Sequence, residues 1–166
     1  MIKFERVSSE QYMKDLSDIR SLTICDVRDY EELKLPARST SGSAGYDFYA
    51  PYDLDIKKGE VFKCITGIRF VTDEKVFLMC CPRSGLGCKH GFRLRNTIGI
   101  IDSDYQHAVN EGHIMAVIEA EEDITVPKGK AFMQGIILPY ITTSDDTLID
   151  GESMVKRTGG FGSTDK

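Results

Sequence analysis

Two aspartates near the middle of the chain have the spacing of a catalytic pair. Asp102 and Asp104 follow the apolar run 96–101. On an extended chain, residues two apart face the same side, so both carboxylates would lie together at the end of a strand. Such a pair can orient a water molecule or a sugar hydroxyl for reaction. The alternative, that both are polar residues of a hairpin turn, fits the same pattern.

An EF-hand calcium loop is excluded at these aspartates. An EF-hand loop that began at Asp102 would need glycine at its sixth position and glutamate at its twelfth. The chain has His107 and His113 at those positions. These two histidines and His90 show no helical metal-ligand spacing, so we interpret all three as surface or structural residues.

A glycine-rich turn is the second stretch that can do chemistry. The segment PRSGLG (82–87) follows an apolar run and contains Arg83, Ser84 and Gly85. A turn that opens a helix can bind phosphate through its backbone amides, and the arginine and serine add donors at the same place. It is not a Walker loop, because G-x-x-x-x-G-K-[ST] occurs nowhere in the chain.

The last ten residues, RTGGFGSTDK (157–166), combine glycines with one aromatic ring and two hydroxyls. The glycines make the segment flexible. Ser163 and Thr164 beside flexible amides can cradle a phosphate while Phe161 covers a flat base. Composition alone favours the alternative, a disordered terminus.

Two further polar residues could belong to a functional site or have a purely structural role. Asp47 is bracketed by glycines and small residues in TSGSAGYDFYA (40–50), and Gln134 interrupts the apolar run KAFMQGIILP (130–139). Each has a structural alternative. Asp47 can cap backbone amides in a turn, and a buried Gln134 can pair with backbone groups.

The composition is that of a globular protein with no expected membrane or nucleic-acid partner. The 166 residues are 41% hydrophobic and 28% charged, which suits one domain with a sizeable core. No apolar run nears the ~18 residues of a membrane span, and the N-terminus lacks the core of a signal peptide. Five cysteines without a CxxC pair indicate reduced thiols and a cytoplasmic location. A net charge of −5 argues against binding to nucleic acid or to a membrane surface.

The hydrophobic pattern predicts helices first and strands afterwards. Ser8 and Gln11 form a capping-box signature, and Tyr12, Leu16 and Ile19 follow at helical spacing. A second short helix is expected at 26–33. Beyond it, β-branched and aromatic runs between turn signals predict strands at 61–70, 75–81, 96–102, 112–120 and 130–138.

This order of elements favours an all-β body of the sandwich or barrel kind. We divide the chain into a partly helical N-terminal extension (1–34), a β body (35–150) and a flexible C-terminal arm (151–166). No repeat recurs at a fixed period, so solenoids and propellers are excluded.

Taken in order, five segments resemble the five motifs of the trimeric dUTPase family, the deoxyuridine triphosphate nucleotidohydrolases. They are SGSAGYD, PRSGLGCKHG, NTIGIIDSDY, KAFMQGII and RTGGFGST, and together they span residues 41–164. The resemblance implies hydrolysis of dUTP to dUMP and pyrophosphate. It also implies a jelly-roll-like β-clip body and a homotrimer with shared active sites, over which the C-terminal arm closes.

The third motif would hold the nucleoside and the water. By resemblance, Asp102 orients the water that attacks the α-phosphorus, and Tyr105 packs on the deoxyribose and excludes a 2′-hydroxyl. Asn96 and the backbone of the following hairpin would read the uracil edge, with Met115 as a further pocket residue. The hairpin residues are Gly99, Ile100 and Ile101.

The other motifs would hold the phosphates. By resemblance, Arg83, Ser84 and Gly85 contact them, while Gln134 and Asp47 belong to the polar network around the phosphates and the water. Mg²⁺ is the implied cofactor, held mainly through substrate phosphates and water, with no direct protein ligand expected. In the arm, Phe161 would stack on uracil and further residues would hold the γ-phosphate, namely Arg157, Gly162, Ser163 and Thr164.

Several features depart from the family pattern. Arg157 is one residue closer to Phe161 than is common, and Asp165 replaces a glycine near the end. About five residues, 107–111, are inserted after Tyr105, and the N-terminal extension lies outside the resemblance. Two alternatives stay open: an enzyme of the same fold similar to dCTP deaminase, and a nucleotide-binding regulatory protein on this scaffold.

Overall fold

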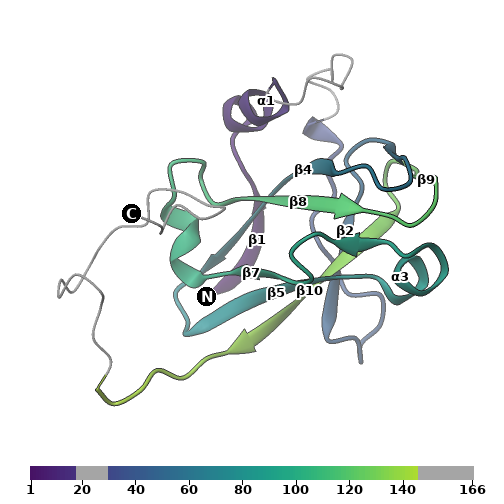
Figure 1. Ribbon diagram of the computed structural model, residues 1–166. Coiled ribbons are helices and arrows are strands. Elements are labelled where there is room, and N and C mark those ends of the chain that lie inside the picture. The colour runs from purple at the N-terminus through teal and green to yellow at the C-terminus, as the bar shows by residue number, and fades with distance from the viewer. Residues whose placement is uncertain (18–29, 146–166) are drawn as a thin grey trace.

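Two antiparallel sheets build the body of the protein. The computed structural model describes residues 1–17 and 30–145. One four-stranded sheet has the order β1-β4-β8-β6 and the other β2-β10-β5-β7, with a small pair β3-β9 beside them (Figure 1). The strands are β1 (Ile2–Arg6), β2 (Gly45–Tyr49), β3 (Leu54–Ile56), β4 (Phe62–Thr72), β5 (Val76–Pro82), β6 (Arg93–Leu94), β7 (Gly99–Ile101), β8 (His113–Glu119), β9 (Ile124–Val126) and β10 (Ala131–Pro139).

The core consists of the apolar side chains that the two sheets share. Phe48, Phe70 and Phe132 are at most 2% exposed, as are Ile65 and Leu78. Burying side chains of this size contributes about 1.5–3 kcal/mol each. The prediction of an all-β body is therefore confirmed.

The five predicted strands are all present, with one shortened. The run 96–102 forms a strand only over Gly99–Ile101, because residues 94–98 make a tight turn. The strands β3, β6 and β9 were missed, since two or three residues carry too little alternation to detect. The five-residue strands β1 and β2 were not among the predicted strands either.

The N-terminal segment joins the body as an edge strand. β1 pairs with β4 from Ile2 opposite Thr72 to Arg6 opposite Ile68. Phe4 brings its ring to 5.6 Å from that of Phe48, at the junction of the two sheets. The division at residue 34 stays a prediction, but Ile2–Arg6 belong to the β1-β4-β8-β6 sheet.

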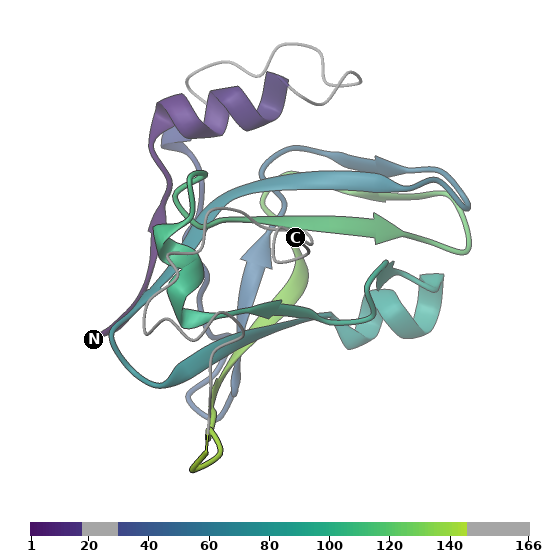
Figure 2. The ribbon, with the colours of Figure 1, turned by 60° about the vertical axis from the view of Figure 1, so that its left-hand side comes forward.

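A short helix, α1 (Ser9–Ser17), follows β1 and lies on the outer side of the β1-β4-β8 layer (Figure 2). Its predicted start is confirmed, because the Gln11 N–H donates to Ser8 Oγ at 3.2 Å. Tyr12 and Leu16 are buried as the spacing predicts, whereas Ile19 lies outside the described residues. None of the helices in the described ranges is long and apolar enough to cross a membrane.

The capping-box prediction is wrong for Gln11, whose side chain does not bind the Ser8 N–H. In that motif the side chain three residues after the cap binds the cap's own N–H. Here Gln11 donates to Asp15 instead, and Glu111 accepts the Ser8 N–H at 2.7 Å. Of the second predicted helix (26–33), the described part begins at Tyr30, where Tyr30 and Glu31 are helical.

Gly112 cannot be replaced without strain, and this gives a stability test. Its φ is +73°, and a Cβ there would lie 2.8 Å from the Tyr105 carbonyl oxygen. Gly59 has a similar φ of +72° but open space around it. We expect Gly59→Ala to cost about 1 kcal/mol from the left-handed backbone alone. Gly112→Ala should cost roughly 1–3 kcal/mol more from overpacking.

Urea unfolding of both variants measures the difference. Equal losses of unfolding free energy would show that the backbone near Gly112 moves aside at no cost.

Candidate functional site

Three residues that the sequence placed around the phosphates, Asp47, Arg83 and Gln134, lie together at one end of the sheet β2-β10-β5-β7. In the pairing register, Gln134 of β10 lies opposite Asp47 of β2 on one side and Cys81 of β5 on the other. Arg83 follows directly after β5, and its Nε lies 3.3 Å from Asp47 Oδ1. The Ser39 hydroxyl donates to Asp47 Oδ2 at 2.7 Å. We call Asp47, Arg83, Ser84 and Gln134 the phosphate cluster.

Gly45 shapes this cluster, although the sequence pattern did not single it out as a site residue. A Cβ at Gly45 would lie 2.5 Å from Gln134 Oε1, so the glycine leaves room for the Gln134 side chain. The Gln134 amide donates to the Pro82 carbonyl at 3.4 Å. The backbone pairing expected as an alternative is therefore present, and it holds Gln134 beside the Arg83 turn.

Ser84 and Gly85 open α3 (Ser84–His90), as the glycine-rich turn predicted. Arg83 precedes the helix in extended conformation, with φ −72° and ψ 138°. The first N–H groups of a helix have no partner within it and attract anions. Both residues and Arg83 are exposed, so an anion can reach them from solvent.

The hairpin before β7 turns unusually tightly. The Thr97 N–H donates to the Leu94 carbonyl at 2.9 Å, and the Ile98 N–H donates to the Asn96 carbonyl at 2.8 Å. Thr97 has φ +70°, which is strained for a β-branched residue. Strain of this kind is concentrated at functional sites. Thr97 was not predicted as a site residue, because threonine is disfavoured in that conformation.

A small pocket lies behind this hairpin. It is about 30 Å³ in volume, which is room for a water molecule or for the edge of a ring. The predicted residues Asn96, Gly99, Ile101 and Met115 all line it, together with Cys80 and Met133 among others. Ile100 is 46% exposed and faces away from it.

The two aspartates do not form the pair that the extended-chain argument predicted. β7 ends at Ile101, and the chain turns into a 3₁₀ helix, η1 (Ser103–His107), with Asp102 as its N-cap residue. Asp102 is still extended (φ −70°, ψ 156°), whereas Asp104 lies in the first turn. The prediction that they face one side is therefore wrong, since the helical turn separates their directions. Both remain exposed.

Tyr105 is buried within η1, with 6% of its surface exposed. Its hydroxyl donates to the His113 carbonyl at 3.1 Å and accepts from Asn110 Nδ2 at 2.8 Å. Asn110 belongs to the 107–111 insertion.

Within one chain, Asp102 and the phosphate cluster lie at opposite ends of the sheet β2-β10-β5-β7. Ile101 pairs with Leu78 of β5, so Asp102 is level with Phe77, whereas Gln134 pairs with Cys81. Four residues of strand separate these levels by about 13 Å. One described chain therefore does not bring Asp102 to the phosphate cluster.

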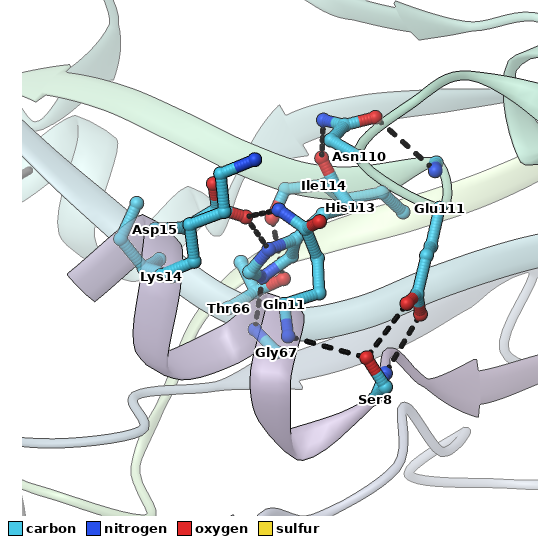
Figure 3. A network of polar contacts seen from close by, with 12 residues as sticks. Ser8, Gln11, Lys14, Asp15, Thr66, Gly67, Asn110, Glu111, His113 and Ile114 are labelled. Atoms are coloured by element: carbon cyan, nitrogen blue, oxygen red, sulfur yellow. Dashed lines mark hydrogen bonds and ion pairs between the residues drawn. The ribbon is translucent and has the colours of Figure 1, made fainter. Parts of the chain in front are cut away.

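A buried histidine connects α1 to β8 (Figure 3). His113 is 0% exposed, and its Nδ1 lies 2.6 Å from Asp15 Oδ2 of α1. Its Nε2 accepts the Gly67 N–H at 2.8 Å. Because an accepting nitrogen carries no proton, the ring is neutral with its proton on Nδ1. The interpretation of His113 as structural is supported.

The described cysteines are free, as the sequence predicted. Burial raises the pKa of the Cys80 thiol to about 12 and raises that of Cys64 as well, so neither ionises at neutral pH. Within residues 1–17 and 30–145, no three His, Cys, Asp or Glu side chains are grouped to hold a metal ion. The arm residues, Arg157, Phe161, Gly162, Ser163 and Thr164, lie outside the described residues.

Comparisons with known proteins agree with one another. The dUTPase family model matches residues 31–165. The deoxyuridine 5′-triphosphate nucleotidohydrolase of Lactococcus lactis is 33% identical over 135 residues, covering 80% of this chain and 88% of that protein. The corresponding protein of Escherichia coli is 35% identical over 144 residues, covering 84% and 92%.

The solved structures to which this chain is similar are also dUTPases. The crystal structure of the dUTPase from Streptococcus mutans is similar with a TM-score of 0.63 and 27% identity, covering 86% of this chain and 98% of that chain. The dUTPase of Staphylococcus bacteriophage 80alpha, solved with dUPNHPP, has a TM-score of 0.62 at 18% identity and covers 99% and 98%. At that identity the likeness shows the fold alone.

The buried His113 predicts how stability depends on pH. Burial, the largest effect, lowers its pKa below 6.5 despite the nearby Asp15 carboxylate. Below pH 6.5 the unfolded chain therefore takes up a proton that the folded chain refuses. The free energy of unfolding should fall from pH 6.5 down to the folded-state pKa, and this residue should contribute no slope above pH 7.

Urea unfolding between pH 5 and 8 measures this slope. His113→Gln should remove part of it, whereas the matched change at the exposed His107, His107→Gln, should leave it unchanged. An unaltered slope in His113→Gln would contradict the assignment.

Proposed function

The chain belongs to the dUTPase family, and on that premise we propose how its residues act on dUTP. The protein is a dUTP diphosphatase with the all-β dUTPase fold, and it hydrolyses dUTP. The observation that supports our assignment of residues is the convergence of Asp47, Arg83 and Gln134 from three different motifs. The comparisons do not favour the dCTP deaminase alternative.

The phosphate cluster binds the triphosphate. Asp47 holds the Arg83 guanidinium through Nε, which leaves the two terminal nitrogens able to donate to phosphate oxygens. Ser84 and Gly85 add the first amides of α3, and Gln134 supplies an amide beside them. A planar guanidinium next to helix-opening amides suits an anion with several oxygens.

The third motif, NTIGIIDSDY, which contains Asp102, binds the nucleoside and the water. The backbone of the strained hairpin at Thr97 is fixed, so its donors and acceptors select uracil by its edge. Cytosine would leave buried polar groups unpaired there. Tyr105 packs on the deoxyribose, and Asp102 orients the water that attacks the α-phosphorus, taking up its proton as general base.

The active site is completed between subunits of a homotrimer. The support is the separation of about 13 Å along the sheet between the levels of Asp102 and Gln134. A water held by Asp102 of one chain reaches an α-phosphorus bound by the phosphate cluster only if that cluster belongs to a neighbouring chain. A three-fold arrangement closes such head-to-tail contacts into a ring.

Mg²⁺ is held through the triphosphate. The Asp47 carboxylate is engaged by Ser39 and Arg83, so it does not serve as a metal ligand. This donor set fits an ion bound by phosphate oxygens and water. When bound, Mg²⁺ would neutralise part of the charge on the phosphates.

The C-terminal arm closes over the bound nucleotide and excludes water other than the attacking molecule. Phe161 covers the uracil, and Arg157, Gly162, Ser163 and Thr164 hold the γ-phosphate. The free thiols of the described residues suit the reducing cytoplasm, where we place the protein.

Asp102→Asn tests the catalytic assignment. Pyrophosphate release in the presence of Mg²⁺ should be selective for dUTP over dCTP, dTTP and UTP in the wild-type protein. Loss of a positioned base should lower kcat about 10²- to 10⁴-fold. The matched change Asp104→Asn, two residues along, should stay within about threefold of wild type, since that side chain points elsewhere.

Equal losses in the two variants would contradict the role of Asp102. Tight dUTP binding without turnover in the wild-type protein would instead favour the nucleotide-binding regulatory protein.

Mixing two inactive variants tests the shared site. In our assignment each active site takes Asp102 from one subunit and Arg83 from a neighbouring subunit. Asp102→Asn and Arg83→Ala therefore disable different subunits' contributions to that site. In trimers formed at random from equal amounts, about a quarter of the sites pair an intact Arg83 with an intact Asp102. Co-expression should therefore restore about a quarter of wild-type activity, measured on trimers purified by size exclusion with light scattering.

No recovery in well-mixed trimers would show that each site is built from one chain.

A further inference from the structure

Ser8, which caps the N-terminal helix α1, is hydrogen-bonded to the inserted loop 107–111. Glu111 accepts the Ser8 N–H at 2.7 Å through Oε2 and the Ser8 hydroxyl at 2.6 Å through Oε1 (Figure 3). The partners are 103 residues apart in the sequence. α1 precedes the family match, which begins at residue 31. Two additions to the family pattern thus support one another.

The residue of the loop that makes this contact lies in a strained turn. The His113 N–H donates to the Asn110 carbonyl at 3.1 Å, and the two residues between, Glu111 and Gly112, have φ +60° and +73°. Glycine adopts that region freely, but a glutamate there is strained. The two hydrogen bonds to Ser8 offset this strain.

The turn aims the Asn110 side chain at Tyr105. Asn110 Nδ2 donates to the Tyr105 hydroxyl at 2.8 Å, and its Oδ1 accepts the Gly112 N–H at 3.2 Å. The amide is therefore fixed at both ends. The Tyr105 hydroxyl in turn donates to the His113 carbonyl at 3.1 Å.

α1 supports the same hydroxyl by a second route. Asp15 of α1 lies 2.6 Å from His113 Nδ1, and His113 provides the carbonyl that Tyr105 contacts. Both partners of the Tyr105 hydroxyl are thus anchored to α1, one through Glu111 and one through Asp15. A phenol held by a donor and an acceptor cannot tilt its ring without breaking one of them.

We propose that Asn110 is a positioning residue that fixes the Tyr105 ring against the deoxyribose and so sharpens rejection of a 2′-hydroxyl, with α1 holding its loop in place. This inference rests on the proposed function, in which Tyr105 packs on the sugar. A ring free to tilt would make room for the extra hydroxyl, so UTP would gain relative to dUTP.

The test is the ratio of kcat/KM for dUTP to kcat/KM for UTP. Asn110→Ala should lower this ratio about three- to tenfold, the change that loss of one ordinary hydrogen bond produces. Tyr105→Phe removes the hydroxyl and keeps the ring, so it should lower the ratio by a similar factor. Because both changes remove one interaction, the double variant should fall no further than either single variant.

Matched variants define the controls. Val109→Ala alters the same loop at a side chain that is 77% exposed, and it should leave the ratio unchanged. Glu111→Ala, which releases the loop from α1, should lower the ratio in the same direction as Asn110→Ala. A loss of stability alone would reduce both substrates' kcat/KM together and leave their ratio intact, and thermal unfolding of each variant is recorded alongside.

Tyr105→Ala distinguishes a failure of the proposed role of Tyr105 from a failure of the positioning role of Asn110. If it leaves the ratio unchanged, Tyr105 does not select the sugar, and the proposed function of that residue fails together with this inference. If it collapses the ratio while Asn110→Ala and Tyr105→Phe do not, the role of Tyr105 stands and only the positioning role of Asn110 is overturned. Additive losses in the double variant would also overturn it.

Discussion

The register of β10 between β2 and β5 is the constraint on which the site depends. Gln134 lies opposite Asp47 on one side and Cys81 on the other, and Arg83 leaves β5 two residues later. A slip of one residue would turn Gln134 to the other face of the sheet. Packing opposes the slip. At Gly135 a Cβ would lie 2.8 Å from the buried Leu78 side chain, so a larger residue brought to that position would have to displace it.

The sequence predicted well the features that depend on neighbouring residues. Long β-branched runs identified β4, β5, β8 and β10, and the Ser8 cap marked the start of α1. The order of five motifs identified the family and supplied the residues of the candidate site as predictions. Those motifs carry their chemistry in contiguous residues, which is why one sequence was enough.

The features it missed depend on distant residues or on local strain. Nothing near Ser8 in the chain points to Glu111, which completes its cap from 103 residues away. Thr97 takes a conformation against its own preference, and the 3₁₀ turn after Asp102 replaces an equally plausible extended chain. Short strands such as β6, with two residues, exist only because β8 lies beside them.

The contact between Ser8 and Glu111 also has a consequence for the order in which the protein is made. α1 has nine residues, too few for a stable isolated helix in water. Its cap, its buried Asp15 and the strand that precedes it all need partners that lie later in the sequence. During synthesis this segment therefore leaves the ribosome before its partners do, and it stays unpaired until the turn before β8 has been made.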